Sequence, residues 1–321
     1  MSVTLNGGVT FGGGLTLTAA PPAGPTAGWF AGGLNPAISA TSVVDRITYA
    51  TDTATATVRG PLSGITYGQV SAGTLAQGWF GGGYTYPIGP PYQISTVQRI
   101  TYATDTSTAS VRGPLNSTNN FLGATSDQTT YGWFVGGLPM KSTVERITYA
   151  SDTATASIRG PLSYPQARMG STGNTTDGWF ASGSIDLGGN TGSSVQRITY
   201  ASDTATASAR GPLSVALTFS AGTGTNTDGW IGGGGSGTTV QRITYATDTA
   251  TASVRGPLSI GLSQLSASTD NTTYGWWAGG LPSPYVSTVQ RITYATDTVT
   301  ASVMGPLSLA RKALSATSGI Q

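Results

Sequence analysis

Apolar and hydroxyl-bearing residues alternate along most of this chain, in short runs bounded by Gly, Pro, Asp and Ser. In the run 249–254, small apolar side chains occupy every second position and Thr or Ser the others, which is the period of a β-strand with two different faces. Ala-Thr-Asp-Thr at 246–249 predicts a tight turn before this strand, and Gly256-Pro257 ends it. Because no stretch has a convincing 3.6-residue period, we expect an all-β protein with almost no helix.

The pattern recurs six times, and two landmarks measure it. An Arg-Ile-Thr-Tyr motif has its arginine at Arg46, Arg99, Arg146, Arg197, Arg242 and Arg291. A Gly-Trp pair has its tryptophan at Trp29, Trp79, Trp133, Trp179, Trp230 and Trp276. From each Arg to the next Trp the chain counts 33 or 34 residues, whereas from each Trp to its own Arg it counts 12 to 20. A fixed count indicates strands held in register, since a slip would turn side chains to the wrong face, and a variable count indicates a loop.

Six units of about 49 residues, each with four short strands, are the pattern of a six-bladed β-propeller. The C-terminal segment 313–318 repeats the segment that elsewhere precedes Gly-Trp, such as 265–268, but no Gly-Trp follows it. We therefore expect this strand to complete the blade that begins at Trp29 and to close the ring over residues 28–321. Residues 1–27 then form an N-terminal β arm. The rival assignment makes Leu15 to Ala19 the missing inner strand.

Two resemblances carry this interpretation further. Gly-Trp-Phe-Ala-Gly-Gly at 28–33 and Ser-Thr-Val-Glu-Arg-Ile-Thr-Tyr at 142–149 resemble successive strands of kelch repeats, which implies four antiparallel strands per blade. Ala156 stands where kelch repeats carry a second Trp. One segment is kept almost unchanged in all copies: Tyr-Ala-Thr-Asp-Thr-Ala-Thr-Ala-Ser-Val-Arg-Gly-Pro-Leu-Ser. This segment resembles repeats of structural and appendage proteins of marine bacteriophages, particularly cyanophages. That resemblance implies a virion protein assembled in the host cytoplasm.

Composition limits the chemistry that the chain offers. It has no Cys and no His, which removes disulfides, thiol nucleophiles, His-based triads and the usual zinc ligand sets. Its net charge of +2 is spread over few charged residues, so there is no basic stripe for phosphates. The sequence has neither a signal-peptide pattern nor a run of about 18 apolar residues. We expect no catalytic residue, no metal site, no cofactor, no nucleic-acid partner and no membrane insertion.

Residues that recur once per blade are interpreted as scaffold, because a single active site would not need six copies. The six Trp are expected to fill the space between blades, with stacking on sugars as the alternative. The Arg of the Arg-Ile-Thr-Tyr motif, and a second set in the Arg-Gly-Pro motif, are expected to pair with backbone carbonyls or with the repeated turn aspartates. Those aspartates are Asp52, Asp105, Asp152, Asp203, Asp248 and Asp297. Four further carboxylates before Gly-Trp are interpreted as turn residues rather than a glycosidase pair, namely Asp127, Asp177, Asp228 and Asp270.

Recognition is expected where the repeat varies. In a propeller the variable loops of all repeats lie on one face, and the Ala-Thr-Asp-Thr turns lie on the opposite face. The longest loop, 84–92, carries Tyr84, Tyr86 and Tyr92 together with three prolines that limit its freedom, and is the candidate partner-binding loop. The alternative is a rigid loop packed over its own rim.

Together these features predict a non-enzymatic virion structural protein, a tail, fibre or head appendage. Its propeller would contact other virion proteins, or a glycan or protein of the host surface, and residues 1–27 would bind a virion partner or the propeller's own side. A carbohydrate-binding or adhesive module at a cell surface is the alternative, and a glycan-active enzyme comes third.

Overall fold

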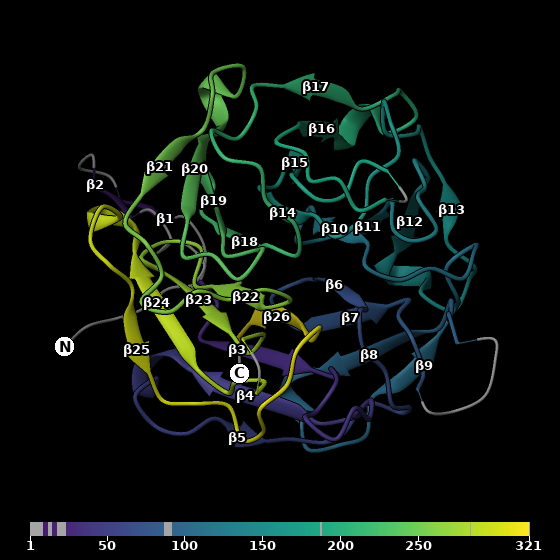
Figure 1. Cartoon of the computed structure of the whole chain (residues 1–321), viewed down its shortest axis with the longest axis vertical. Helices are drawn as coiled ribbons and strands as arrows, with labels where there is room; N and C mark the ends of the chain where they lie inside the picture. The colour runs from purple at the N-terminus through teal and green to yellow at the C-terminus, as the bar shows by residue number, and fades with distance from the viewer. Residues whose placement is uncertain are drawn as a thin grey trace.

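The computed structural model describes residues 24–86, 92–186, 188–282 and 284–320, together with the backbone of two arm strands, β1 (Val9–Phe11) and β2 (Leu15–Leu17). Six antiparallel sheets of four strands stand in a ring around a central axis (Figure 1). The chain is therefore a six-bladed β-propeller, as its repeat predicts. Helix in the described residues amounts to six 3-10 turns of three residues, such as Tyr102–Thr104, one after each Arg-Ile-Thr strand.

Every blade has the same order from the centre outwards: an inner strand, a Gly-Trp strand, an Arg-Ile-Thr strand and an outer strand. Blades 1 to 3 are β26 (Ser315–Gly319), β3 (Ala27–Ala31), β4 (Val44–Thr48), β5 (Thr57–Val58); β6 (Val70–Gly73), β7 (Gln77–Gly81), β8 (Val97–Thr101), β9 (Ser110–Arg112); and β10 (Gly123–Ser126), β11 (Tyr131–Val135), β12 (Val144–Thr148), β13 (Ser157–Ile158). Blades 4 to 6 are β14 (Gly170–Gly173), β15 (Asp177–Ala181), β16 (Val195–Thr199), β17 (Ser208–Arg210); β18 (Ala221–Gly224), β19 (Asp228–Gly232), β20 (Val240–Thr244), β21 (Ser253–Arg255); and β22 (Ser266–Thr269), β23 (Tyr274–Ala278), β24 (Val289–Thr293), β25 (Ser302–Met304).

The C-terminal strand closes the ring, which confirms the predicted closure. β26 pairs with β3 in a register that sets Thr317 opposite Trp29, the same pairing that Thr125 makes with Trp133 in blade 3. The rival assignment of Leu15 to Ala19 as the inner strand is wrong. β26 fills that position, and Leu15–Leu17 pairs with Val9–Phe11 as a separate two-stranded hairpin.

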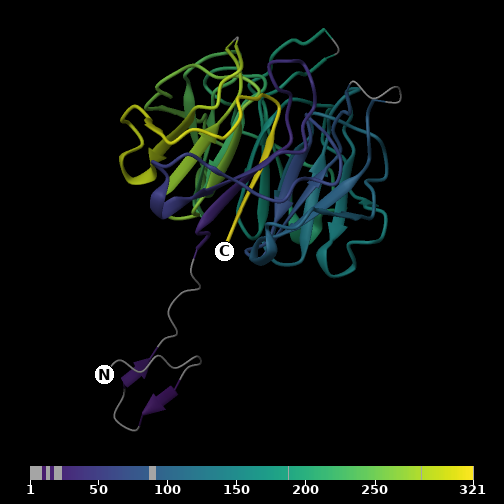
Figure 2. The same cartoon turned by 90° about the horizontal axis from the view of Figure 1, so that it is seen from below.

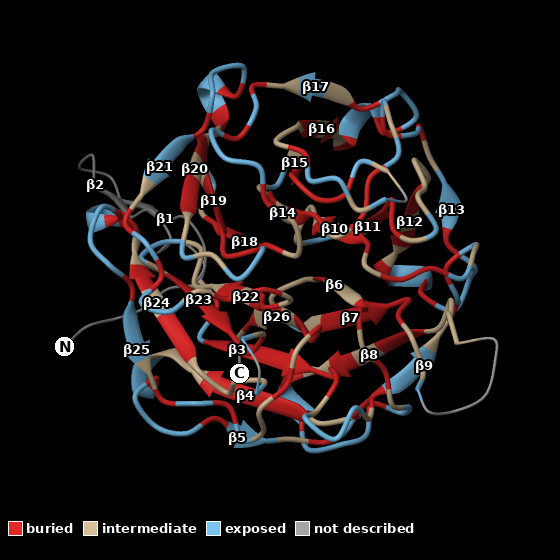
Figure 3. Ribbon diagram, viewed as in Figure 1, coloured by how far each residue is buried: buried red, intermediate tan, exposed pale blue. Residues whose placement is uncertain are grey.

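The outer strands are shorter than the alternation predicts. The expected strand 249–254 begins only at Ser253 in β21, because Ala252 donates its N–H to the carbonyl of Pro212 in the preceding blade at 2.9 Å. Ala252 is buried while Val254 is 56% exposed, so the two do not share a face as a continuous strand would require. Figure 3 shows the consequence: the Gly-Trp and Arg-Ile-Thr strands in the middle of each blade are largely buried, and the outer strands around them are exposed.

The two faces of the ring carry different connections. The loop face carries the segments between Gly-Trp and Arg-Ile-Thr strands and between each outer strand and the next inner strand. The turn face carries the short connections after the inner strands and the 3-10 turns. The C-terminal end of β26 lies on the turn face, the lower side in Figure 2. The variable loops and the near-identical turns therefore lie on opposite sides.

Candidate functional site

The repeated Trp, Arg and Asp residues meet at the interfaces between blades. Asp105 Oδ2 accepts a hydrogen bond from Trp29 Nε1 at 2.9 Å and one from Arg46 Nη1 at 3.0 Å, and Arg59 Nε lies 3.5 Å away. The other copies join Trp79, Arg99 and Arg112 to Asp152; Trp133, Arg146 and Arg159 to Asp203; Trp179, Arg197 and Arg210 to Asp248; Trp230, Arg242 and Arg255 to Asp297; and Trp276 and Arg291 to Asp52. In the last copy Met304 replaces the second Arg. All six Trp are buried, so none of them presents a ring to a ligand.

The Tyr of each Arg-Ile-Thr-Tyr motif completes this interface. Tyr102 stacks on Trp29 of the preceding blade with ring centroids 3.9 Å apart, and its hydroxyl pairs with Thr317 Oγ1 at 2.8 Å. The five equivalent Trp–Tyr pairs stack with centroids 3.9 to 4.2 Å apart. Burial raises the pKa of Tyr102 far above its ordinary value, which the hydrogen bond to Thr317 only partly offsets. These phenols remain neutral spacers between blades.

Five tyrosines cluster on the loop face. Tyr84, Tyr86 and Tyr92 lie in the connection between β7 and β8, and Tyr67 precedes β6. Ring centroids are 5.6 Å apart for Tyr67 and Tyr84, 5.7 Å for Tyr84 and Tyr92, and 6.2 Å for Tyr86 and Tyr92. The pKa of Tyr67 is raised, first by burial and then by the neighbouring phenols, which include Tyr285 from the loop after β23. We call these five residues the tyrosine cluster.

The base of this loop is firmly attached to the propeller. The backbones of Tyr67 and Tyr84 exchange two hydrogen bonds, of 3.0 and 2.8 Å, and Ala40 of blade 1 donates to the carbonyl of Tyr86 at 3.0 Å. Tyr86 nevertheless leaves 41% of its surface exposed. Among the described residues, none is hydrogen-bonded to the hydroxyl of any of the five tyrosines. The prolines expected to stiffen the loop, at 87, 90 and 91, lie outside the described residues.

A closed ring of backbone hydrogen bonds surrounds the central channel at the loop face. Before each inner strand one residue adopts a positive φ, and its N–H donates to the carbonyl of the equivalent residue one blade back, over 2.7 to 3.0 Å. The six residues are Gly68, Phe121, Arg168, Phe219, Gln264 and Ala313. Phe121 and Phe219 meet edge to face with centroids 5.3 Å apart. Sequence reasoning missed these residues because their side chains differ from blade to blade. The available signal was their constant position two residues before each inner strand.

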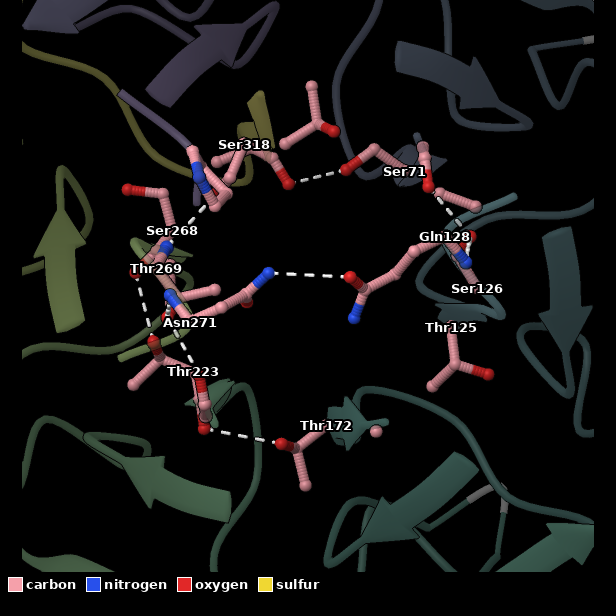
Figure 4. Close-up of a pocket in the computed structure, with 18 of the residues that line it drawn as sticks. Ser71, Thr125, Ser126, Gln128, Thr172, Thr223, Ser268, Thr269, Asn271 and Ser318 are labelled. Atoms are coloured by element: carbon pink, nitrogen blue, oxygen red, sulfur yellow. Dashed lines mark hydrogen bonds between the residues drawn. The ribbon is translucent and has the colours of Figure 1, made fainter. Parts of the chain in front are cut away.

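The opposite mouth of the channel opens on the turn face as a cavity of about 180 Å³. Hydroxyl, amide and small side chains line it, and none of its lining residues is charged (Figure 4). Asn271 of blade 6 and Gln128 of blade 3 meet across the mouth, with Asn271 Nδ2 donating to Gln128 Oε1 at 3.4 Å. Pro25 also lines the cavity, and Thr26 bonds to Gly319 of β26 at 2.8 Å. The N-terminal segment therefore enters the propeller at this mouth.

The four remaining carboxylates before Gly-Trp fall into two kinds. Asp127 Oδ1 accepts three turn N–H groups, from residues 129, 130 and 131, and Asp270 does the same in blade 6. Asp177 and Asp228 differ from the expected turn role. They begin β15 and β19 and lie 3.5 and 3.7 Å from Arg197 and Arg242 of the adjacent strand. All four are thus engaged by their own blade.

Neither a metal-binding cluster nor a membrane-spanning helix is present in the described residues. They contain no group of three or more His, Cys, Asp or Glu side chains arranged to hold a metal ion. None of the helices found in these same segments is long and apolar enough to span a bilayer. Compared with known proteins, the chain matches no family model and no curated protein at a significant level.

Proposed function

We propose that this protein is a non-enzymatic structural component of a bacteriophage particle, with a kelch-like propeller that serves as a binding platform. The observation that carries the proposal is the opposition of its two faces. The N-terminal segment joins the ring at Pro25 on the turn face, and the tyrosine cluster lies on the loop face. The arm would hold the propeller to another virion protein, and the loop face would meet a host glycan or protein.

The chemistry of the loop face favours recognition. Tyrosines offer large amphipathic contact area at a small loss of side-chain entropy, and a rigid backbone beneath them lowers the entropic cost of binding. The tyrosine cluster combines an attached loop base with five phenol hydroxyls that have no partner among the described residues. The same surface would serve the alternative function, an adhesive or carbohydrate-binding module of a cell surface, which the hydroxyl-lined and amide-lined cavity on the turn face also favours.

A binding role fits the channel better than catalysis. General acid–base chemistry needs a titratable side chain within hydrogen-bond reach of the reacting atoms. The cavity on the turn face presents Ser, Thr, Asn and Gln side chains instead. The repeated carboxylates are each engaged by Trp and Arg of a neighbouring blade, as Asp105 is by Trp29 and Arg46.

Deleting residues 2–20 tests the proposal. We expect the truncated chain to keep the melting temperature of the propeller, because Thr26 and β3 remain, and to disappear from purified particles when it replaces the full chain. Replacing Thr16 in the arm by Ser is the matched control and should leave incorporation unchanged. Normal incorporation of the truncated chain would remove the anchoring role of the arm. Absence of the full-length chain from particles would overturn the virion proposal.

A further inference from the structure

Arg168 differs from the other arginines of this protein in its surroundings. Each of the other twelve has a carboxylate oxygen within 4 Å. Among the described residues, no carboxylate oxygen lies within that distance of Arg168, whose Nε, like that of most of the other arginines, is buried without a hydrogen-bond partner. A guanidinium that is partly desolvated and has no carboxylate partner is a binding group for an anion from outside the chain.

The local structure holds this guanidinium at the loop-face mouth of the channel. Its Cζ lies 4.7 Å from the centroid of the Phe219 ring, and Nη1 donates to the hydroxyl of Ser184 at 3.3 Å. The backbone of Arg168 has φ of +61° and donates to the carbonyl of Phe121 at 2.8 Å. A side chain kept over the channel by a left-handed backbone, a cation–π contact and a hydrogen bond is organised before any ligand arrives.

The surroundings define the size and the polarity of the ligand. Phe121, Arg168 and Phe219 belong to blades 3 to 5 of the ring, and the ring of Phe121 extends over Gly68 of blade 2. Gln264 of blade 6 and Ala313 complete the lining of the recess. The recess between them holds about 70 Å³, less than a cavity that encloses a whole ring, so a ligand would place its charged group and one edge of its ring there. The two aromatic side chains provide an apolar wall, and the guanidinium provides an anion-binding group next to it.

We propose that this recess binds an acidic sugar unit, with its carboxylate or sulfate on the Arg168 guanidinium and its ring against Phe121 and Phe219. The planar guanidinium accepts such an anion in a two-point geometry that an ammonium group cannot reproduce. The inference rests on the proposed use of the loop face for recognition and names the chemistry of the partner. Acidic peptides and free inorganic anions are the competing occupants that the test separates.

The test uses the purified full chain and biolayer interferometry on four immobilised probes: polygalacturonate, dextran sulfate, neutral dextran and poly-glutamate. Because it needs no particle, its result is independent of whether the protein is incorporated into virions. We expect at least tenfold tighter binding to polygalacturonate or dextran sulfate than to dextran. The two acidic polysaccharides, polygalacturonate and dextran sulfate, show whether carboxylate or sulfate is preferred.

Variants then assign the binding to Arg168. Arg168→Gln should weaken binding to the preferred acidic polysaccharide at least tenfold. Arg168→Lys should recover only part of that binding, because lysine restores the charge but not the two-point geometry of the guanidinium. Lys141→Gln removes one positive charge from the same face and should change binding less than twofold. Thermal melting verifies that all variants fold. Equal losses for Arg168→Gln and Lys141→Gln, equal binding to dextran, tighter binding to poly-glutamate, or full competition by 10 mM phosphate would each overturn the proposal.

Discussion

Trp276 Nε1 donates a hydrogen bond to Asp52 Oδ2 at 2.7 Å, across the seam where the last blade meets the first. The two residues are 224 positions apart in the chain, yet the contact repeats the one that Trp29 makes with Asp105 inside the ring. The seam is therefore built as a sixth copy of the blade interface. It differs in one respect, since Met304 leaves Asp52 with a single arginine.

This difference predicts unequal penalties for two equivalent substitutions. Asp105→Asn leaves Arg46 and Arg59 without their carboxylate, whereas Asp52→Asn leaves only Arg291. Breaking a buried ion pair by removing one partner costs about 3–5 kcal/mol. We expect Asp105→Asn to lose free energy of unfolding in that range and Asp52→Asn to lose about 1 kcal/mol less, because Asp52 lacks the second ion pair that Arg59 makes with Asp105 at 3.5 Å. Urea denaturation measures both, and equal losses would contradict the shared-carboxylate account.

The blade that contains the chain closure carries its own buried ion pair. Asp45 and Arg311 are fully buried, 3.1 Å apart, where blade 4 has Gln196 and Gln166 in hydrogen-bond contact at 3.0 Å. We expect Asp45→Gln or Arg311→Gln alone to destabilise the protein by about 3–5 kcal/mol, because each leaves a buried charge without its partner. The double variant recreates the neutral pair of blade 4 and should recover most of that loss. A double-mutant cycle in urea measures the coupling, and additive losses would show that the pair is not coupled.

The tyrosine cluster predicts a loss of binding without a loss of fold. Replacing Tyr84, Tyr86 and Tyr92 together by Ser removes most of the aromatic surface of the loop while the backbone bonds to Tyr67 and Ala40 remain. We expect weaker attachment to the partner or host and a melting temperature lowered by only a few degrees. Tyr86→Ser alone, at the most exposed position, should weaken attachment with no change in melting temperature. Tyr164→Ser, a half-buried tyrosine of another loop, is the control. Unchanged attachment, or loss of folding, would make the loop part of the scaffold.

The six interface tyrosines predict alkaline unfolding. Burial raises the pKa of each of them above its ordinary value: Tyr49, Tyr102, Tyr149, Tyr200, Tyr245 and Tyr294. The unfolded chain releases these protons near pH 10 while the folded chain keeps them. Stability is therefore fully present below about pH 10 and falls above it, by about 1.4 kcal/mol per pH unit for each tyrosine. Absorbance of phenolate at 295 nm, followed together with circular dichroism, should show these six ionising only as the fold is lost. Their ionisation in the folded state would contradict this reading of the interface.

The sequence by itself determined the scaffold. A fixed count between landmarks set the number of blades and the register of their strands, and a C-terminal segment without a following Gly-Trp identified the closing strand. The recurrence of Arg also predicted pairing between blades, with a turn Asp or with backbone carbonyls, and the structure shows the first of these, as between Arg46 and Asp105. These features repeat, and the sequence reveals them because equivalent residues have the same surroundings in every blade.

Only the tertiary structure decided what does not repeat. The length of the outer strands depends on hydrogen bonds to the neighbouring blade, such as the one from Ala252 N–H to the carbonyl of Pro212. These bonds shorten the strands that the alternating pattern predicts. The tyrosine cluster joins Tyr67 to Tyr285, and the recess at Arg168 joins it to Phe219, from loops whose sequences share no motif. The ion pair of Asp45 with Arg311 exists only because closure brings the two chain ends together. Such contacts depend on which loops are neighbours in the folded ring, and a local sequence pattern does not show this.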